Sequence, residues 1–282
     1  MHRNRFAVFG HPVAHSRSPY IHAAFAAQCG IELDYARIDA GPDDFGAALH
    51  RFAVDGGRGA NVTLPHKGAA ATLCATRSAR AERAAAVNTL VRLEDVDGGA
   101  RWHGDNTDGI GLVRDLRERH RVMLDGARAL LIGAGGAAGG VAPALLDAGL
   151  AALVITNRSD DRLAALGSRL DDPRVNLRAW DDVGNENAID IVINTTSAAR
   201  SDAAIEWPLP RVLAADWTAV DLGYGDAARA FLDAAAQRGA GARIDGLGML
   251  VEQAAESFRL WHGVMPDTAP VYAALRDGRD LR

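Results

Sequence analysis

The sequence predicts an α/β protein organised as two domains. Short apolar runs alternate with stretches of helical periodicity, which is the pattern of successive βαβ units. A length of 282 residues suits one large domain or two of ordinary size. The alternation starts afresh near residue 108. We therefore expect an N-terminal α/β domain over 1–107, a second domain over 108–240, and helices over 241–282 that return to the first domain.

The first domain begins with a buried strand, and strands and helices then follow in turn. Leu33–Ile38 alternates apolar and polar side chains, as a half-buried strand does. Pro42 and two aspartates mark the start of the second helix. The expected strands are 6–9, 33–38, 59–64 and 87–93, and the expected helices are 20–29, 43–54 and one after Pro65. This alternation predicts a parallel sheet.

The second domain repeats the alternation with longer apolar strands, typical of a doubly wound sheet buried on both faces. The expected strands are 127–132, 153–156, 190–194 and 219–222, and the expected helices are 109–120, 141–148 and 161–170. The segment 246–281 is expected to be mostly helical, with the apolar spacing of a packed helix at Met249, Leu250, Val251 and Phe258.

The composition is that of a soluble globular protein. Apolar residues make up 48% and charged residues 24%, and the formal net charge is −5 without any long run of arginine or lysine, which argues against a nucleic-acid surface. Cys29 and Cys74 do not form a metal-binding spacing, and we expect both to be free thiols. Neither a signal peptide nor a membrane span is apparent, so the sequence predicts a cytoplasmic protein without a metal.

A glycine-rich turn joins the first strand and helix of the second domain. Gly133, Ala134, Gly135, Gly136 and Ala137 follow a buried strand and precede a helix, and Ala138 completes a G-x-G-x-x-A pattern. Such a turn lets the backbone approach a pyrophosphate at the N-terminus of the helix. We therefore predict a Rossmann-type dinucleotide-binding domain; the alternative is an ordinary turn between a strand and a helix.

The end of the next strand indicates which dinucleotide binds. A carboxylate at this position usually bonds the ribose 2′-hydroxyl of NAD. The sequence has Asn157 and Arg158 there instead, with Arg162 four residues after Arg158. A guanidinium can bind a 2′-phosphate through two hydrogen bonds, so the pattern favours NADP. The alternative is an arginine solvated near the start of a helix.

Two polar segments of the first domain follow predicted strands. Ser16 and Ser18 lie two residues apart before a helix, where serines most often act as caps. Asn61 and Thr63 share one face of a strand. Lys67 follows the proline that ends this strand, where a lone lysine is more often solvated.

Two further segments place polar residues where a purely structural role is less easily explained. Asn88 lies inside an apolar run, and a buried asparagine needs hydrogen-bond partners. The segment 104–109 has the sequence Gly-Asp-Asn-Thr-Asp-Gly and includes Asp105. The alternative to a functional role is a turn followed by a helix cap.

Together these segments closely resemble the shikimate dehydrogenase family. The matching motifs occur in order over nearly the whole chain: 9–19 (FGHPVAHSRSP), 61–67 (NVTLPHK), 86–90 (AVNTL), 104–109 (GDNTDG), 133–137 (GAGGA), 156–158 (TNR) and 245–253 (DGLGMLVEQ). None would be convincing alone, but the ordered set is specific.

The resemblance implies the reversible NADPH-dependent reduction of 3-dehydroshikimate to shikimate, in the biosynthesis of chorismate and the aromatic amino acids. It implies Lys67 and Asp105 as the catalytic pair. The implied substrate-binding residues are Ser16, Ser18, Asn61, Thr63, Asn88, Asp105, Tyr224 and Gln253. The implied NADP-binding residues are Gly133, Ala134, Gly135, Gly136, Ala137, Asn157, Arg158, Arg162, Leu222, Gly246 and Met249.

The chemistry suits these residue types. Hydride delivery to a ketone builds negative charge on its oxygen, and a nearby ammonium can stabilise that charge and donate the proton. Lys67 fits this role, and Asp105 could orient it while holding a substrate hydroxyl. Short hydroxyl and amide side chains suit a substrate with a carboxylate and three oxygen-bearing carbons.

Three features depart from the family pattern: the segment 194–200 (NTTSAAR) lacks the glycine that often follows its Thr-Ser pair, and two single positions differ. Ala85 replaces a glycine, and Ala79 stands where an acidic residue often lies near the nicotinamide. The alternatives that remain are a quinate or quinate/shikimate dehydrogenase and an NADPH-binding regulatory protein without turnover. The expected partners are the small-molecule substrate and, at most, a second copy of the chain, without nucleic acid or membrane.

Overall fold

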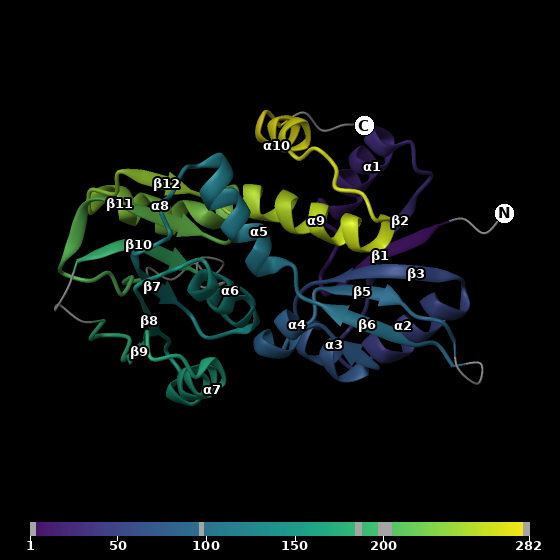
Figure 1. Cartoon of the computed structure of the whole chain (residues 1–282), viewed down its shortest axis with the longest axis horizontal. Helices are drawn as coiled ribbons and strands as arrows, with labels where there is room; N and C mark the ends of the chain where they lie inside the picture. The colour runs from purple at the N-terminus through teal and green to yellow at the C-terminus, as the bar shows by residue number, and fades with distance from the viewer. Residues whose placement is uncertain (1–3, 96–98, 184–187, 197–204, 279–282) are drawn as a thin grey trace. The chain divides into compact units, whose positions relative to one another are not determined.

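The computed structural model describes residues 4–95, 99–183, 188–196 and 205–278 (Figure 1). The chain divides into two compact units: unit 1 comprises residues 1–111 and 251–282, and unit 2 comprises residues 112–250. The chain therefore passes between the units within two helices, α5 (Asp108–Arg114) and α9 (Leu247–His262). These crossing points lie later in the chain than the boundaries that the sequence indicated.

Unit 1 is built on a sheet with the strand order β2-β1-β3-β5-β6-β4. The strands are β1 (Arg5–Gly10), β2 (Asp34–Asp39), β3 (Gly57–Val62), β4 (Thr76–Arg77), β5 (Thr89–Arg92) and β6 (Trp102–Asp105). β1 runs parallel to β2 and β3, and β4 runs parallel to β6, but β5 is antiparallel to both β3 and β6. The expectation of a parallel sheet therefore holds for the pairings of β1 with β2 and β3 and of β4 with β6, whereas β5 makes this sheet a mixed one. Residues 93–101 are too few for the crossover that a parallel β5–β6 pair would need.

Helices cover both faces of this sheet because the side chains of β1 alternate between them. The ring centroid of Phe9 lies 5.7 Å from that of Phe45 on α2, whereas the ring of Phe6 lies 4.7 Å from Trp261 on α9. The C-terminal segment therefore returns to unit 1, as the sequence predicted (Figure 1). The other helices of unit 1 are α1 (Ser18–Cys29), α2 (Phe45–Val54), α3 (Lys67–Leu73), α4 (Ala79–Ala84) and α10 (Ala269–Arg276).

Unit 2 contains a fully parallel sheet with the order β12-β11-β10-β7-β8-β9. Counted from β7, the order is 3-2-1-4-5-6, which is that of dinucleotide-binding Rossmann domains. The strands are β7 (Arg128–Ile132), β8 (Ala152–Thr156), β9 (Val175–Arg178), β10 (Ile189–Asn194), β11 (Leu213–Asp221) and β12 (Ala242–Ile244). The prediction of a doubly wound domain is confirmed.

Two clusters of buried apolar side chains pack against the two faces of this second sheet. Leu131 packs in one cluster with Val141 and Leu145, and its neighbour Leu130 packs in the other with Trp217 and Phe231. The helices are α6 (Gly136–Asp147), α7 (Asp160–Leu170) and α8 (Asp226–Gln237), together with a π-helical turn, η1 (Asp115–Arg119), that continues α5. Among the described residues, no helix is long and apolar enough to cross a bilayer.

The edge strands β9 and β12 are absent from the sequence prediction. They are short and only partly buried, so their side chains lack the apolar periodicity by which strands are recognised. Because β12 pairs with β11, residues 242–244 belong to unit 2, although the sequence assigned the segment after residue 240 to the first domain.

The residue after α4, Ala85, adopts a left-handed conformation with φ of 49°. A side chain in this conformation costs roughly 1–2 kcal/mol, and glycine avoids that strain at a smaller cost in chain entropy. We expect Ala85→Gly to raise the free energy of unfolding by about 0.5–1 kcal/mol, measured by urea denaturation. Ala69→Gly, within α3, is the matched control and should lower it by about the same amount. A loss of stability in Ala85→Gly would contradict the prediction.

Candidate functional site

A lysine and an aspartate form a close pair in unit 1. Lys67 is the first residue of α3, two residues after the cis proline Pro65 that follows β3. Its Nζ donates to Asp108 Oδ2 at 2.5 Å. Only 15% of the Lys67 side chain and 7% of the Asp108 side chain are exposed, so solvent screens this pair much less than a surface ion pair.

Asn88 holds the other oxygen of Asp108. Its Nδ2 donates to Asp108 Oδ1 at 2.8 Å and to Thr107 Oγ1 at 2.9 Å, while its Oδ1 accepts from the Thr107 backbone at 2.8 Å. Gln253 Oε1, on α9, lies 3.4 Å from Asn88 Nδ2 and from Thr107 Oγ1. The structure therefore brings together Lys67, Asn88 and Gln253, three of the predicted residues, around a carboxylate that the sequence analysis did not select.

Asp105 is not the partner of Lys67. Arg80 Nε donates to Asp105 Oδ1 at 2.6 Å and Arg80 Nη2 to Oδ2 at 2.9 Å. Ser78 Oγ and the Asn106 backbone also donate to Oδ1, at 2.5 Å and 2.7 Å. The Asp105 side chain is only 5% exposed, and its oxygens are occupied within the protein. The geometry therefore does not support the assignment of Asp105 to the catalytic pair or to substrate binding, and Asp108 is the carboxylate that pairs with Lys67.

Asn61 was predicted to bind substrate, but its side chain lies inside a buried hydrogen-bond network. Its Oδ1 accepts from Tyr35 at 2.7 Å and from His22 Nε2 at 3.0 Å, and its Nδ2 donates to Ser257 at 3.0 Å. Burial lowers the pKa of His22 to about 3, so this imidazole is neutral at physiological pH. Asn61 therefore joins β3 to α1, β2 and α9, and its role in substrate binding stays a prediction. Thr63, two residues on, is half-buried at the end of the same strand.

Ser16 and Ser18 lie next to one another before α1. Their hydroxyl oxygens are 3.2 Å apart, and Ser18 also hydrogen-bonds Tyr35, the partner of Asn61. Ser16 Oγ also accepts from the backbone N–H of Ser18, the first residue of α1, at 3.3 Å, so Ser16 satisfies one of the free N–H groups at the start of the helix although the N-cap residue is Arg17. Ser16 is half-buried and Ser18 is buried.

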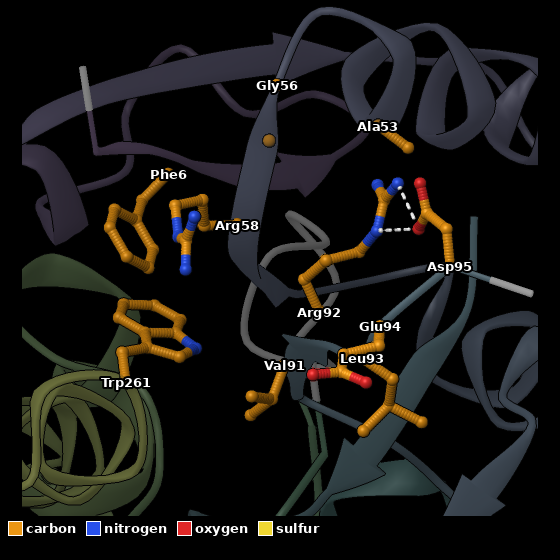
Figure 2. A pocket seen from close by; sticks show the side chains of 11 residues that line it. Phe6, Ala53, Gly56, Arg58, Val91, Arg92, Leu93, Glu94, Asp95 and Trp261 are labelled. Carbon is orange, nitrogen blue, oxygen red and sulfur yellow. Dashed lines mark hydrogen bonds and ion pairs between the residues drawn. The ribbon is translucent and has the colours of Figure 1, made fainter. Parts of the chain in front are cut away.

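A separate cavity of about 460 Å³ lies at the other end of the sheet (Figure 2). It contains none of the predicted site residues; its lining includes Phe6, Arg58, Arg92 and Trp261. Phe6 lies near the start of β1, whereas Lys67 follows the end of β3. Its two arginines are balanced by Glu94 and Asp95, so the lining does not select one sign of charge.

In unit 2 the glycine turn has the geometry that the sequence predicted. Gly133 has φ of 114°, and a Cβ there would lie 2.4 Å from Thr195 Oγ1. At Gly135 and Gly136, by contrast, a Cβ would meet no protein atom within 4 Å. No side chain caps the start of α6. Open space beside uncapped backbone N–H groups at a helix N-terminus fits a pyrophosphate. Ala134 and Ala137 complete the turn, buried and half-buried respectively.

The end of β8 borders this turn. Asn157 Oδ1 accepts from the Ala134 backbone at 3.2 Å, and its Nδ2 donates to the Ser159 carbonyl at 2.9 Å, so Asn157 ties strand and turn together. Arg158 is exposed, with its guanidinium carbon 5.1 Å from the centre of the Trp180 ring. Arg162, on α7, is also exposed. Arg158 directly follows Asn157, which is bonded to the turn, and Arg162 lies in the first turn of α7.

The remaining predicted residues lie after β11 and at the start of α9. Gly246 is buried, and a Cβ there would lie 2.2 Å from the Leu222 carbonyl oxygen, so this glycine permits a close backbone contact. Met249 is 8% exposed and belongs to the core of unit 2, while Leu222 is half-buried. Tyr224 is half-buried and lies in unit 2, unlike the other predicted substrate residues.

Sequence reasoning missed Asp108, Arg80 and Ser257. Asp105 and Asp108 occupy the same short segment, and an aspartate at the start of a helix is usually explained as a cap. Among the described residues, no cluster of three or more His, Cys, Asp or Glu side chains could hold a metal ion.

Fold and site together define a two-unit α/β protein with a Rossmann-type dinucleotide domain and a shielded lysine–aspartate pair. Three family models match the chain: "Shikimate dehydrogenase substrate binding domain" over residues 8–90, "Shikimate / quinate 5-dehydrogenase" over 115–204, and "Shikimate 5'-dehydrogenase C-terminal domain" over 246–276. The chain belongs to the shikimate dehydrogenase family.

Individual relatives agree with this placement. The shikimate dehydrogenase (NADP(+)) of Xylella fastidiosa strain M12 is 56% identical over 274 residues, covering 96% of this chain and 95% of that protein. The structure of the Thermus thermophilus shikimate 5-dehydrogenase in complex with NADP(H) and shikimate aligns with a TM-score of 0.76 and 34% identity, over 97% and 99% of the two chains. An Ael1 enzyme from Pseudomonas putida aligns with a TM-score of 0.85 and 40% identity, over 96% and 98%.

Proposed function

We propose that this protein is an NADP-dependent oxidoreductase that reversibly reduces 3-dehydroshikimate to shikimate, a step towards chorismate and the aromatic amino acids. The observation that carries the assignment is the shielded pair of Lys67 Nζ and Asp108 Oδ2, 2.5 Å apart, in a chain that belongs to this family. Family membership supports the reaction, and the pair supplies the group that its chemistry needs.

The composition of the chain adds a reason to assign the proton transfer to Lys67. Of the 31 basic residues, 30 are arginines, and Lys67 is the only lysine in the sequence. Arginine holds its positive charge as well as lysine does, but it does not release a proton in proteins. A lysine is therefore present at the one position where the proposed reaction requires a proton donor.

In unit 1, Lys67 donates the proton to the developing alkoxide and Asp108 orients the ammonium. Asn88 holds Asp108 through Oδ1, so the carboxylate cannot turn away from Lys67. Ser16, Ser18, Thr63 and Gln253 bind the carboxylate and hydroxyls of the substrate. Tyr224 is assigned to the same substrate from unit 2. Unit 1 is accordingly the substrate-binding domain.

Unit 2 is the NADP-binding domain. NADPH supplies the hydride when it is bound. Residues 133–137 and the N-terminus of α6 receive the pyrophosphate, and Asn157 fixes the turn against β8. Arg158 and Arg162 bind the 2′-phosphate. Leu222, Gly246 and Met249 shape the nicotinamide end of the site. We assign the protein to the cytoplasm, as a monomer or homodimer.

The assignment is tested by following the nicotinamide absorbance band with shikimate and with quinate, each in the presence of NADP or NAD. We expect turnover with shikimate and NADP. Turnover of quinate at a comparable kcat/KM would make the protein a quinate/shikimate dehydrogenase. NADPH binding without turnover of either compound would instead favour a regulatory protein and end the proposal.

A further inference from the structure

Two buried carboxylates and two partly exposed arginines form a cluster near the Lys67–Asp108 pair. Arg80, on α4, binds both oxygens of Asp105, and its Nη2 also donates to Glu256 Oε1 at 3.1 Å. Arg259 binds the same carboxylate: its Nη2 donates to Glu256 Oε1 at 2.7 Å and its Nε donates to Glu256 Oε2 at 3.1 Å. Arg80 is therefore the cation shared by two carboxylates whose side chains are only 5% and 2% exposed.

The charges of this cluster depend on Arg80. Burial raises the pKa of Glu256, but the hydrogen bonds from Arg259 and Arg80 outweigh burial and bring the pKa to about 2. Burial likewise raises the pKa of Asp105, and the bonds from Arg80 and Ser78 reverse the shift so that the pKa falls below its usual value. Both carboxylates are therefore ionised at neutral pH, and without Arg80 the buried charge of Asp105 would have no cation bound to it in the described structure.

The cluster reaches the catalytic pair through consecutive hydrogen bonds along one loop. Asp105 Oδ1 accepts from the Asn106 backbone at 2.7 Å, and Asn106 Oδ1 accepts from the Asp108 backbone at 3.1 Å. Asn106 Nδ2 also donates to the Ala86 carbonyl at 3.0 Å, beside Asn88. The backbone of Asp108 is thus set by Asn106, and the orientation of Asn106 is set by Asp105.

We propose that Arg80 is a positioning residue for the proton transfer: by clamping Asp105 against Glu256, it fixes the loop that presents Asp108 to Lys67. The inference rests on the proposed function. Arg80 itself does not contact Lys67 or Asp108 in any hydrogen bond of the described structure, so its effect must pass through the loop. A lysine could not replace it, because only a planar guanidinium binds one carboxylate at two points while reaching a second.

The test compares Arg80→Ala with wild type in kcat, in NADPH affinity and in the NMR signal of Lys67. Because the chain has a single lysine, protein grown with isotope-labelled lysine has one labelled side chain. We expect kcat to fall on the order of 10- to 100-fold, since small displacements of a catalytic group have effects of this size. NADPH affinity should stay unchanged, and the Lys67 signal should shift or broaden.

Two comparisons separate positioning from general destabilisation. Arg83→Ala removes an exposed arginine from the same helix and should leave both kcat and the Lys67 signal unchanged. In a Lys67→Ala background, Arg80→Ala should change the residual rate by less than about twofold, because the group that it positions is already gone. If Arg80→Ala does not fold, Arg80→Gln, which retains a single donor group, takes its place in every comparison.

A folded Arg80 variant with kcat within about twofold of wild type would overturn the proposal. So would a fall in kcat that leaves the Lys67 signal unmoved, or one that persists undiminished in the Lys67→Ala background. Absence of turnover in the wild type would instead refute the proposed function, and the Lys67 signal would still show whether Arg80 controls the environment of the pair.

Discussion

Lys67→Ala is expected to lower kcat on the order of 10²–10⁴-fold, the range lost when a general acid is removed. The variant removes the ammonium that Asp108 orients at 2.5 Å, together with the proton that the product hydroxyl receives. The glycine turn and the arginines near Asn157 lie in unit 2 and are untouched, so the dissociation constant for NADPH should not change. Steady-state kinetics and a fluorescence titration with NADPH measure the two quantities separately.

Lys67→Arg is the sharper control. It retains the positive charge and can still bind Asp108, but a guanidinium does not release its proton. If Lys67 acts only as an electrostatic partner, Lys67→Arg should recover much of the activity; if it donates the proton, the variant should remain nearly as slow as Lys67→Ala. A near-normal kcat in Lys67→Ala would end the assignment.

The sequence indicated most residues of the site in unit 1, but it did not indicate which aspartate pairs with Lys67. Ser16, Ser18 and Lys67 were selected through the family resemblance, and Asn88 also because a buried asparagine needs hydrogen-bond partners. Asp105 and Asp108 lie three residues apart in one segment, and periodicity does not say which side chain turns towards Lys67. That choice depends on Arg80, whose place beside Asp105 follows from how α4 packs against β6, a tertiary contact.

The same limit applies to Asn61. Alternation along β3 predicts that Asn61 and its immediate neighbours in the sequence lie on opposite faces of the sheet. It does not predict whether the face of Asn61 contacts substrate or other polar side chains of the protein. The partners of Asn61 come from α1, β2 and α9, which are distant in the sequence. By contrast, the fold of unit 2 was predictable because its strands are apolar on both faces and the glycine turn marks the first of them.

Arg158→Ala is expected to lower kcat/KM for NADPH by about 10–100-fold, the equivalent of roughly 1.5–3 kcal/mol for hydrogen bonds to a charged group. The value for NADH should change little, because NADH lacks the 2′-phosphate. The guanidinium carbon of Arg158 lies 5.1 Å from the centre of the Trp180 ring, and this contact restricts the conformations of an otherwise exposed side chain. The ratio of the two kcat/KM values therefore reports directly on this side chain.

Arg169→Ala, an exposed arginine at the far end of α7, is the matched control and should leave that ratio unchanged. Arg162 lies four residues after Arg158, in the first turn of α7, and could share the phosphate, so the double variant Arg158→Ala/Arg162→Ala should lose more selectivity than either single change. An unchanged ratio in the double variant would show that preference for NADP arises elsewhere in unit 2. An equal loss for NADPH and NADH would place Arg158 against a part of the cofactor that both dinucleotides share.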